Sequence, residues 1–444
     1  MNSIFKRLSS FQIIILGFAA VILTGALLLM LPLSSAESGS ASFSDALFTS
    51  VSAVCVTGLV TQDTATYWSG FGQAVILILI QIGGLGVVSA ATSVTWLSKR
   101  KINLRQRSAM QEAISAPQVG GVVKFTVFIF KVTLIAELSG CILMMPVFCK
   151  EMGFLKGLWY SVFHSVSAFC NAGFDLMGFK QKFSSLTSYV GNPLINITVM
   201  LLIFSGGLGF LTWDDIKTHK LHFKKYRMQS KVIIVTTSLL LVLPAVYFFF
   251  CEFSHWDMPL SEKILASAFQ SVTPRTAGFN TADFGLMRGG SICLIIILML
   301  IGGSSGSTAG GMKTNTFAIM VSSAVSVFKR KEDTNFFGRR IAQEAVQKAS
   351  AILMLYLGLF LSGGTAISVI EGLPFKECLF EAASAIGTVG LSMGITTQLG
   401  TSSRIILMLL MFFGRVGGLT LIFAAFNSSA NNSAKLPLEK ISIG

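Results

Sequence analysis

One short phrase, a glycine followed by a bulky apolar residue, occurs four times in this chain of 444 residues. The glycines stand at positions 58, 173, 278 and 390, which are 115, 105 and 112 positions apart. The four copies are Val56-Thr57-Gly58-Leu59, Asn171-Ala172-Gly173-Phe174, Thr276-Ala277-Gly278-Phe279 and Thr388-Val389-Gly390-Leu391. Self-similarity at a nearly fixed period indicates an internal fourfold repeat. We call the four phrases glycine turns 1 to 4.

The segments around the first glycine turn define the repeating unit. Hydrophobic residues make up 52% of the chain and charged residues only 12%, which places the chain in a bilayer. The stretches from Leu8 to Ala36 and from Thr64 to Ser98 carry no charge, and each is long enough to span. Between them, Asp45 to Val54 is too short to cross a hydrocarbon core of about 30 Å. The unit is therefore a span, a half-helix, a glycine turn and a second span.

The same order recurs three more times along the chain. Further spans are predicted near 122–149, 190–213, 231–253, 288–328, 346–370 and 403–426, with half-helices at 158–170, 262–274 and 376–387. We therefore predict an all-α polytopic membrane protein with eight spans and four re-entrant half-helices around one central pore. The four pseudo-symmetric repeats occupy residues 1–110, 111–220, 221–340 and 341–444, the last including the C-terminal tail.

Basic residues set the expected orientation and explain the net charge of +14. They gather before the first span and in the three linkers between repeats, as Lys6, Arg7, Lys99, Arg100, Lys101, Arg105, Arg107, Lys217, Lys220, Lys224, Lys225, Arg227, Lys231, Lys329, Arg330, Lys331, Arg339, Arg340 and Lys348. Cytoplasmic segments of membrane proteins are enriched in Lys and Arg, so both termini and these linkers are expected in the cytoplasm. The positive balance therefore reflects topology rather than nucleic-acid binding, and the glycine turns open on the outer side.

A non-helical turn at membrane depth is tolerated only where it is buried in protein or lines a watery path. Four such turns around one axis would direct carbonyl oxygens to a common centre, where they replace the water shell of a cation. The half-helices point their partly negative C-terminal ends at the same centre. No acidic residue occurs within the turns, which favours a monovalent cation over Ca²⁺ or Mg²⁺. A single glycine of this kind is explained by helix packing, but four at one period indicate a filter.

The predicted span 288–328 contains a second unusual segment, which is rich in glycine. It consists of Gly302, Gly303, Ser304, Ser305, Gly306, Ser307, Thr308, Ala309, Gly310 and Gly311. Each glycine costs a helix about 1 kcal/mol relative to alanine, so the helix is expected to break here. The corresponding stretches 83–86, 206–209 and 414–418 are shorter, and we expect them to remain helical. Arg415 lies in the last of them, where a charge requires a partner or a water-filled cavity, or else must extend to the cytoplasmic interface.

Two enzymatic or nucleotide-binding interpretations of this segment have little support. A phosphate-binding loop needs a glycine directly before its lysine, and Met312 precedes Lys313. A serine hydrolase built on Ser304 or Ser305 needs a base, and His164 is the only histidine expected near membrane depth. A packed or hydrogen-bonded histidine is the simpler interpretation of His164. No enzymatic activity is therefore predicted.

The four glycine turns and the glycine-rich segment together resemble the Ktr/Trk/HKT superfamily of potassium transporters, and the resemblance covers essentially the whole chain. It implies a selectivity filter for K⁺ formed by Val56, Thr57, Gly58, Asn171, Ala172, Gly173, Thr276, Ala277, Gly278, Thr388, Val389 and Gly390. It also implies that residues 302–311 form an intramembrane gating loop, assisted by Lys313 and Arg415. Gly58 resembles the potassium-type members, although the second glycine of channel filters is absent from all four turns.

The resemblance also carries expectations about partners. It implies potassium uptake across the bacterial cytoplasmic membrane, a homodimer, and control by a cytosolic ring of RCK-type subunits that bind ATP or ADP. No cofactor is expected in this chain itself, and the tail from Asn431 to Gly444 is expected near the dimer contact. Arg275 and Glu381 are expected to brace the filter. Two alternatives stay open: an alternating-access symporter coupling K⁺ to Na⁺ or H⁺, and, more distantly, the intramembrane serine hydrolase.

Overall fold

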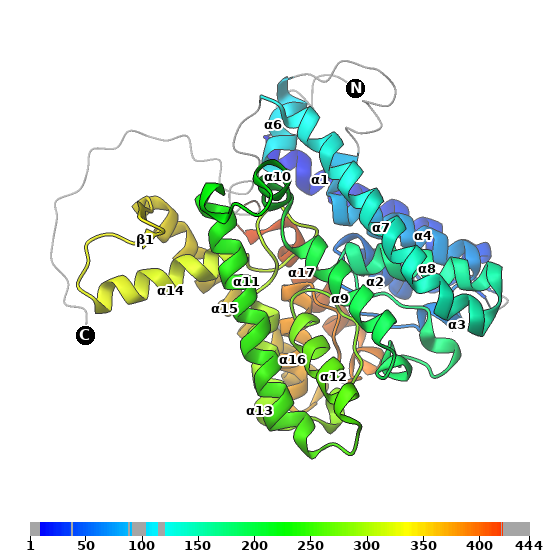
Figure 1. The fold of residues 1–444 in the computed structure, drawn as a ribbon. Coiled ribbons are helices and arrows are strands. Elements are labelled where there is room, and N and C mark those ends of the chain that lie inside the picture. The colour runs from blue at the N-terminus through cyan, green and yellow to red at the C-terminus, as the bar shows by residue number, and fades with distance from the viewer. Residues whose placement is uncertain are drawn as a thin grey trace.

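The computed structural model describes residues 9–36, 39–87, 89–90, 104–113, 120–418 and 420. This part of the chain is helical, in agreement with the predicted class, apart from a short hairpin (Figure 1). The hairpin pairs β1 (Asn335–Phe336) with β2 (Arg339–Arg340) in antiparallel register. The predicted basic linker at 99–101 and the tail 431–444 lie outside the described residues.

The helices follow the predicted order. They are α1 Ser10–Leu29, α2 Phe43–Val54, α3 Thr64–Tyr67, α4 Gly70–Leu85, α6 Leu104–Ala113, α7 Val122–Met152, α8 Phe154–Phe169, α9 Pro193–Gly207, α10 Phe210–His219, α11 Met228–Tyr247, α12 Leu260–Val272, α13 Gly289–Leu300, α14 Thr314–Phe328, α15 Gln343–Glu371, α16 Phe375–Gly387 and α17 Thr401–Val416. Single 3₁₀ or π turns occur at Pro32–Ser34, Met177–Phe179, Thr187–Tyr189, Phe223–Lys225, Phe248–Glu252, Phe253–His255, Phe284–Leu286 and Thr396–Gln398.

The predicted half-helices correspond to α2, α8, α12 and α16, and at most three residues separate each of them from its glycine turn. Each packs closely against the long helix that precedes it, as α2 does on α1 and α8 on α7. The bulky residue that follows each turn glycine, namely Leu59, Phe174, Phe279 or Leu391, is buried in the apolar core. Burial of a large apolar side chain contributes about 1.5–3 kcal/mol, so this residue anchors each turn in the core.

The expectation that only the third repeat breaks its second span is wrong. Helices α4, α9 and α17 also end inside the corresponding glycine stretches, followed by Gly86, Gly209 and Gly417 at φ of 86°, 89° and 91°. Only glycine adopts this left-handed conformation without steric cost, so each of these glycines redirects the chain. Between α9 and α10 the change of direction is 97°. The third repeat differs in the length of its break, which runs from α13 to α14.

The predicted span from Thr64 to Ser98 is likewise interrupted near its start. The short helix α3 ends before Trp68, and α4 begins anew at Gly70. Side-chain caps explain this, because Asp63 accepts backbone N–H groups of Ala65 and Thr66 while Ser69 accepts that of Gly72. Residues 91–98 lie outside the described part of the chain.

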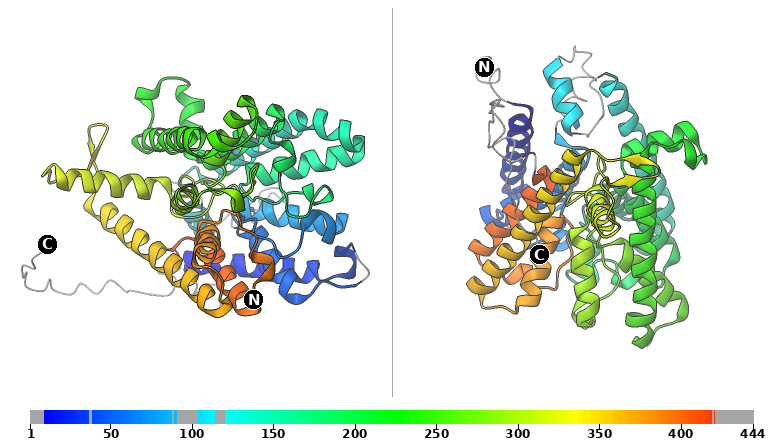
Figure 2. Two further views of the ribbon diagram at one scale, coloured as in Figure 1. Left: turned by 90° about the horizontal axis from the view of Figure 1, so that it is seen from below. Right: turned by 90° about the vertical axis from the view of Figure 1, so that its left-hand side faces the viewer.

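Four helical segments within the described residues are long and apolar enough to cross a membrane: Phe11–Leu29, Val122–Met152, Met228–His255 and Gln343–Glu371. The bent pair α9 and α10 makes a fifth candidate, whereas α4, α13 and α14 are shorter apolar helices. The breaks therefore divide second spans into pieces too short to cross alone. Seen from two further directions, the helices surround a central region where the loop between α13 and α14 lies, while α14 projects to one side (Figure 2). From the hairpin beyond α14, α15 runs back to pack against α16 and α17.

Candidate functional site

The four glycine turns meet in a closed ring, in chain order. Each turn glycine lies against the next turn, as the position of an added Cβ atom shows. A Cβ atom on Gly58 would lie 2.4 Å from Ala172 O, and one on Gly173 would lie 2.8 Å from Gly278 Cα. A Cβ atom on Gly278 would lie 2.5 Å from Val389 O, and one on Gly390 would lie 2.1 Å from Thr57 O. An ion pair of 3.0 Å between Arg404 and Asp45 also joins the last repeat to the first. Residues more than 300 positions apart in sequence thus become neighbours around one centre.

The turns share one backbone conformation. Their first residues are left-handed, with φ of 55° at Val56, 58° at Asn171, 69° at Thr276 and 50° at Thr388. The glycines have φ of 90°, 70°, 82° and 92° in turns 1 to 4. A left-handed non-glycine residue costs of order 1–3 kcal/mol and persists only where the surroundings enforce it. The repetition of this strain in all four turns indicates a functional constraint on the backbone.

Hydrogen bonds from the half-helices hold these turns and occupy their N–H groups. The N–H groups of Thr57, Ala172 and Val389 each donate to a half-helix carbonyl at 2.8 Å. The Gly58 and Gly390 N–H groups donate to Ser52 Oγ at 3.1 Å and Ser384 Oγ at 3.0 Å. With the N–H groups bound, the turn carbonyls remain available as acceptors at the centre of the ring.

Three threonine hydroxyls in the turns strengthen this description. The Oγ1 atoms of Thr57, Thr276 and Thr388 are buried and contact no hydrogen-bonding partner within the described structure. Buried polar groups are almost always paired, and an unpaired one calls for a specific explanation such as a bound ion or water. The four half-helix C-termini direct partial negative charge to the same place. The donor set therefore fits a dehydrated monovalent cation.

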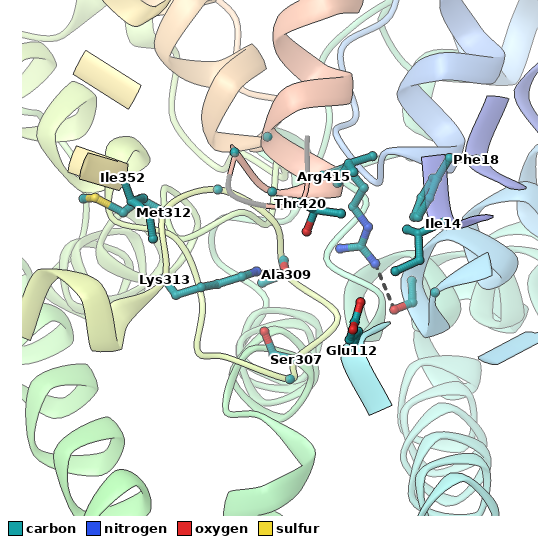
Figure 3. Close-up of a pocket in the computed structure, with 18 of the residues that line it drawn as sticks. Ile14, Phe18, Glu112, Ser307, Ala309, Met312, Lys313, Ile352, Arg415 and Thr420 are labelled. Carbon is teal, nitrogen blue, oxygen red and sulfur yellow. Dashed lines mark hydrogen bonds between the residues drawn. The ribbon is translucent and has the colours of Figure 1, made fainter. Parts of the chain in front are cut away.

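Two cavities lie on either side of this ring and share no lining residue. The first, which we call the glycine cavity, has a volume of about 170 Å³ and is lined by all four turn glycines. The second, the loop cavity, measures about 300 Å³ and is lined by the glycine-rich segment and by the broken ends of α4 and α17 (Figure 3). Two hollows separated by the ring and the loop are the arrangement expected of a pathway with a constriction.

The glycine-rich segment lines the loop cavity and also lies against the ring. An added Cβ on Gly310 would lie 2.1 Å from Thr388 Oγ1, so the segment lies directly against turn 4. Its amides bind carbonyls released by the helix breaks: Ser304 N donates to Gly207 O at 3.0 Å, Thr308 N to Gly206 O at 3.2 Å and Gly311 N to Gly414 O at 3.1 Å. The breaks that the sequence did not reveal thus supply the acceptors that hold the loop in place.

Arg415 connects the same segment to the end of α4 in the first repeat. Its guanidinium donates to the carbonyls of Thr308 and Gly83, and to that of Gly84 at 3.0 Å. It therefore points toward the glycine-rich segment (Figure 3). Lys313 approaches from the opposite side and donates to Ala309 O at 2.7 Å and Gly310 O at 3.3 Å. Two basic side chains thus contact the loop from opposite sides.

The structure separates the residues of the hydrolase interpretation. His164 Nδ1 lies 2.7 Å from the Tyr160 carbonyl oxygen, and Nε2 accepts the Leu176 N–H at 3.2 Å. Both ring nitrogens are thus engaged within the second repeat, and neither contacts Ser304 or Ser305. Lys313 donates to carbonyls of its own loop, as described above, which does not support the interpretation of the loop as a phosphate-binding loop. Glu381 accepts hydrogen bonds from Ser392 and Thr396, in the segment that follows turn 4.

Two functional features were not predicted from the sequence. Asp63 and Asp175 line the glycine cavity, and no lysine or arginine is among the described residues that line it. Asp175 could have been found by its position two residues after the glycine of turn 2. No comparable sequence pattern marks Asp63. Its carboxylate accepts the N–H groups of Thr66 and Phe183, each at 3.0 Å, and Phe183 is 120 positions away in sequence.

Comparison with known proteins places this geometry in a family. Residues 5–435 match the family model TrkH, described as cation transport protein. Similar proteins are the potassium/sodium uptake protein NtpJ of Enterococcus hirae, 39% identical over 99% of this chain and 98% of that protein, and the Ktr system potassium uptake protein B of Bacillus subtilis, 38% identical over 95% and 94%.

A solved structure supports the fold. The potassium transporter TrkH from Vibrio parahaemolyticus aligns with a TM-score of 0.72 at 17% identity, covering 94% of this chain and 84% of that one. The family consists of cation transporters rather than enzymes, as the sequence predicted. The ring of glycine turns, the loop beneath it and these matches agree: the chain belongs to the TrkH family of cation transport proteins.

Proposed function

We propose that this chain is the potassium-translocating subunit of a bacterial uptake system, with the four glycine turns as its selectivity filter. The observation that carries the proposal is the closure of the turns into one ring whose free acceptors are carbonyl and threonine oxygens. The names of the relatives, which refer to potassium or potassium/sodium uptake, support K⁺ as the cargo. K⁺ enters from the glycine cavity and loses part of its water shell to the turn carbonyls.

The gate in this proposal is the segment 302–311 with Lys313 and Arg415. In the closed state the segment lies against turn 4, and the positive charges of Lys313 and Arg415 repel an arriving K⁺. Opening requires the amides of the segment to leave the carbonyls at the helix breaks, and Arg415 to release Thr308. These are hydrogen bonds of about 0.5–1.5 kcal/mol each, or more for a charged donor, so a modest input of binding energy can switch the gate.

The remaining parts of the proposal concern assembly. We place the repeats at 1–110, 111–220, 221–340 and 341–444, with eight spans and both termini in the cytoplasm. Relatives named as components of a Ktr system support a partner subunit, for which an RCK-type cytosolic ring that binds ATP or ADP is the candidate. A homodimer in the cytoplasmic membrane completes this arrangement. The proposal also includes a dependence of K⁺ uptake on Na⁺, and the name of the Enterococcus protein refers to uptake of both ions.

Isothermal calorimetry with the purified chain tests the filter without any partner subunit. K⁺ is expected to bind more tightly than Na⁺ to the wild-type protein. In Gly58→Ser the added side chain would meet Ala172 O at 2.4 Å, and the preference for K⁺ is expected to disappear. Binding of neither ion to the wild-type protein, or an unchanged preference in the variant, would contradict the filter.

External acid is expected to weaken K⁺ uptake through Asp175. Burial raises the pKa of this carboxyl to about 7, and the neighbouring charge of Asp63 adds to the rise. As pH falls through 7, Asp175 takes up a proton, and the glycine cavity loses a negative charge that attracts K⁺. The KM for K⁺ is expected to increase about fivefold between pH 8 and pH 6, the effect of one partly screened charge at several Å.

The variant Asp175→Asn separates this effect from other causes. Its KM is expected to stay high and nearly constant across the same pH range. The control is Asp257→Asn, which removes an exposed carboxylate that does not line the glycine cavity, and which is expected to keep the pH dependence of the wild-type protein. A wild-type pH profile in Asp175→Asn would assign the dependence to another group.

A further inference from the structure

Arg275 is a buried cation that neither the filter nor the gate described above employs. It precedes glycine turn 3 by one residue and is 7% exposed. Its side chain makes no ion pair in the described part of the chain, since it donates only to uncharged oxygens. A buried charge without a counter-charge costs free energy, and such residues are therefore candidates for a functional role.

The guanidinium contacts the two ends of the gating loop at once. Arg275 Nη2 donates to Gly302 O at 3.3 Å and to Thr314 Oγ1 at 2.9 Å, and Thr314 Oγ1 in turn donates to Gly302 O at 3.0 Å. These three groups form a closed triangle at the point where the chain leaves α13 and enters α14. Turn 3 and the base of the loop are therefore joined through one side chain.

The base of the loop is a defined structural unit, which we call the stem. Gly302 N donates to Met312 O at 2.8 Å, Thr314 N donates to Gly303 O at 3.1 Å, and Ile301 and Met312 form a parallel bridge. The rest of the loop binds the broken ends of α9 and α17, which belong to other repeats. Arg275 thus ties the stem to its own repeat, while the outer part of the loop is held by separable contacts.

A small cavity on the other side of Arg275 adds to this arrangement. Arg275 and Thr237 both line it, together with Val272 and Gly303, and its volume is about 20 Å³. The Nε atom of Arg275 and the Oγ1 atom of Thr237 are both buried with no protein partner. A cavity of this size is large enough for one water molecule, while Ile203, Phe204 and Leu241 make the rest of its lining apolar. The two hydrogen bonds of Nη2 hold the guanidinium at the base of the loop.

We propose that Arg275 is a positioning residue that holds the stem of the gating loop against glycine turn 3, so that ion selectivity and gating are coupled. The loop opens by moving its outer part about a fixed stem. Release of the stem frees the loop and at the same time removes the support behind turn 3. This inference rests on the proposed function and extends it to a residue outside the filter and gate.

Arg275→Gln and Thr314→Val test the coupling in proteoliposomes that contain the full chain without a partner. Arg275→Gln is expected to raise the basal K⁺ flux about tenfold and to lower the K⁺/Na⁺ flux ratio by a similar factor, because charge-assisted hydrogen bonds to the stem are lost. Thr314→Val keeps the charge and the volume but removes the hydroxyl that accepts from Arg275 and donates to Gly302 O, and is expected to change both quantities in the same direction. Arg275→Lys should restore part of each.

The control is Arg288→Gln, which removes an arginine of the same repeat whose side chain donates to Cys251 O, away from the loop. It is expected to behave like the wild-type protein. If Arg275→Gln and Thr314→Val change the flux but leave the K⁺/Na⁺ ratio unchanged, Arg275 braces the fold only and the coupling is refuted. If Arg275→Gln does not fold, Thr314→Val alone decides by the same two readouts. A wild-type protein without K⁺ flux would instead refute the proposed function.

Discussion

Replacement of Gly390 by alanine is expected to lower K⁺ flux at least about 100-fold, because a displacement of reacting groups by 1 Å can already cost this factor. The added Cβ would lie 2.1 Å from Thr57 O and 2.9 Å from Gly58 Cα, both of them backbone atoms of the adjacent turn. Backbone atoms cannot rotate away as a flexible side chain can. Turns 1 and 4 must therefore separate, and the ring of carbonyl oxygens loses its geometry. Flux into K⁺-loaded proteoliposomes measures the effect.

Gly394→Ala is the matched control for this experiment. Gly394 has φ of 94°, nearly the same as the 92° of Gly390, and it lies four residues further along the same segment. No atom lies within 4 Å of an added Cβ at Gly394. Both variants therefore carry the cost of a left-handed alanine, and only Gly390→Ala carries the steric clash. If Gly394→Ala reduces the flux as much as Gly390→Ala, then backbone strain is responsible and contact within the ring is not.

Replacement of Arg415 by alanine is expected to raise the basal K⁺ flux of the partner-free protein by about 10- to 100-fold. The substitution removes hydrogen bonds to Thr308, Gly83 and Gly84, and charge-assisted hydrogen bonds contribute about 1.5–3 kcal/mol each. It also removes a positive charge that opposes cations at the constriction. Both effects favour an open pathway. Flux of ⁸⁶Rb⁺ into proteoliposomes without nucleotide measures the leak.

Two further variants define the origin of that leak. Lys313→Met removes contacts that lie within the loop and its immediate end, so it is expected to raise the flux less than Arg415→Ala does. Arg330→Ala removes an exposed arginine beyond the end of α14 and is expected to leave the flux unchanged. Equal fluxes in the wild-type protein and Arg415→Ala would show that Arg415 does not hold the gate closed.

Much of the architecture can be predicted from the sequence because it depends on local properties. Long, mostly apolar stretches identify helices such as α7 and α15, and short segments of helical character directly before the turn phrases identify the half-helices. The period of Gly58, Gly173, Gly278 and Gly390 places the four turns. The glycine-rich run from Gly302 to Gly311 predicts the break between α13 and α14, since a helix containing that many glycines is unstable.

The same local reasoning failed at Gly86, Gly209 and Gly417. One or two glycines in an apolar stretch are compatible with a continuous helix, so the free-energy cost of these glycines alone does not predict that the helix ends there. The helices end there because the freed carbonyls gain partners from elsewhere, as Gly207 does from Ser304 and Gly84 from Arg415. A loop that lies about 100 positions or more away in sequence supplies the compensating hydrogen bonds for the breaks at Gly209 and Gly417.

The sequence by itself thus determined the helical class, the positions of the four turns and the presence of a long loop between α13 and α14, and it predicted a fourfold repeat. Only the tertiary structure decided that the turns close into one ring in chain order, that Arg415 points into the loop, and that Arg275 joins turn 3 to the stem. The physical reason is that helix formation and hydrophobicity act over a few residues, whereas these contacts connect atoms of different repeats. The pair Arg415 and Gly84 is separated by 331 positions, and no local pattern specifies which carbonyls a guanidinium will reach once the repeats have packed.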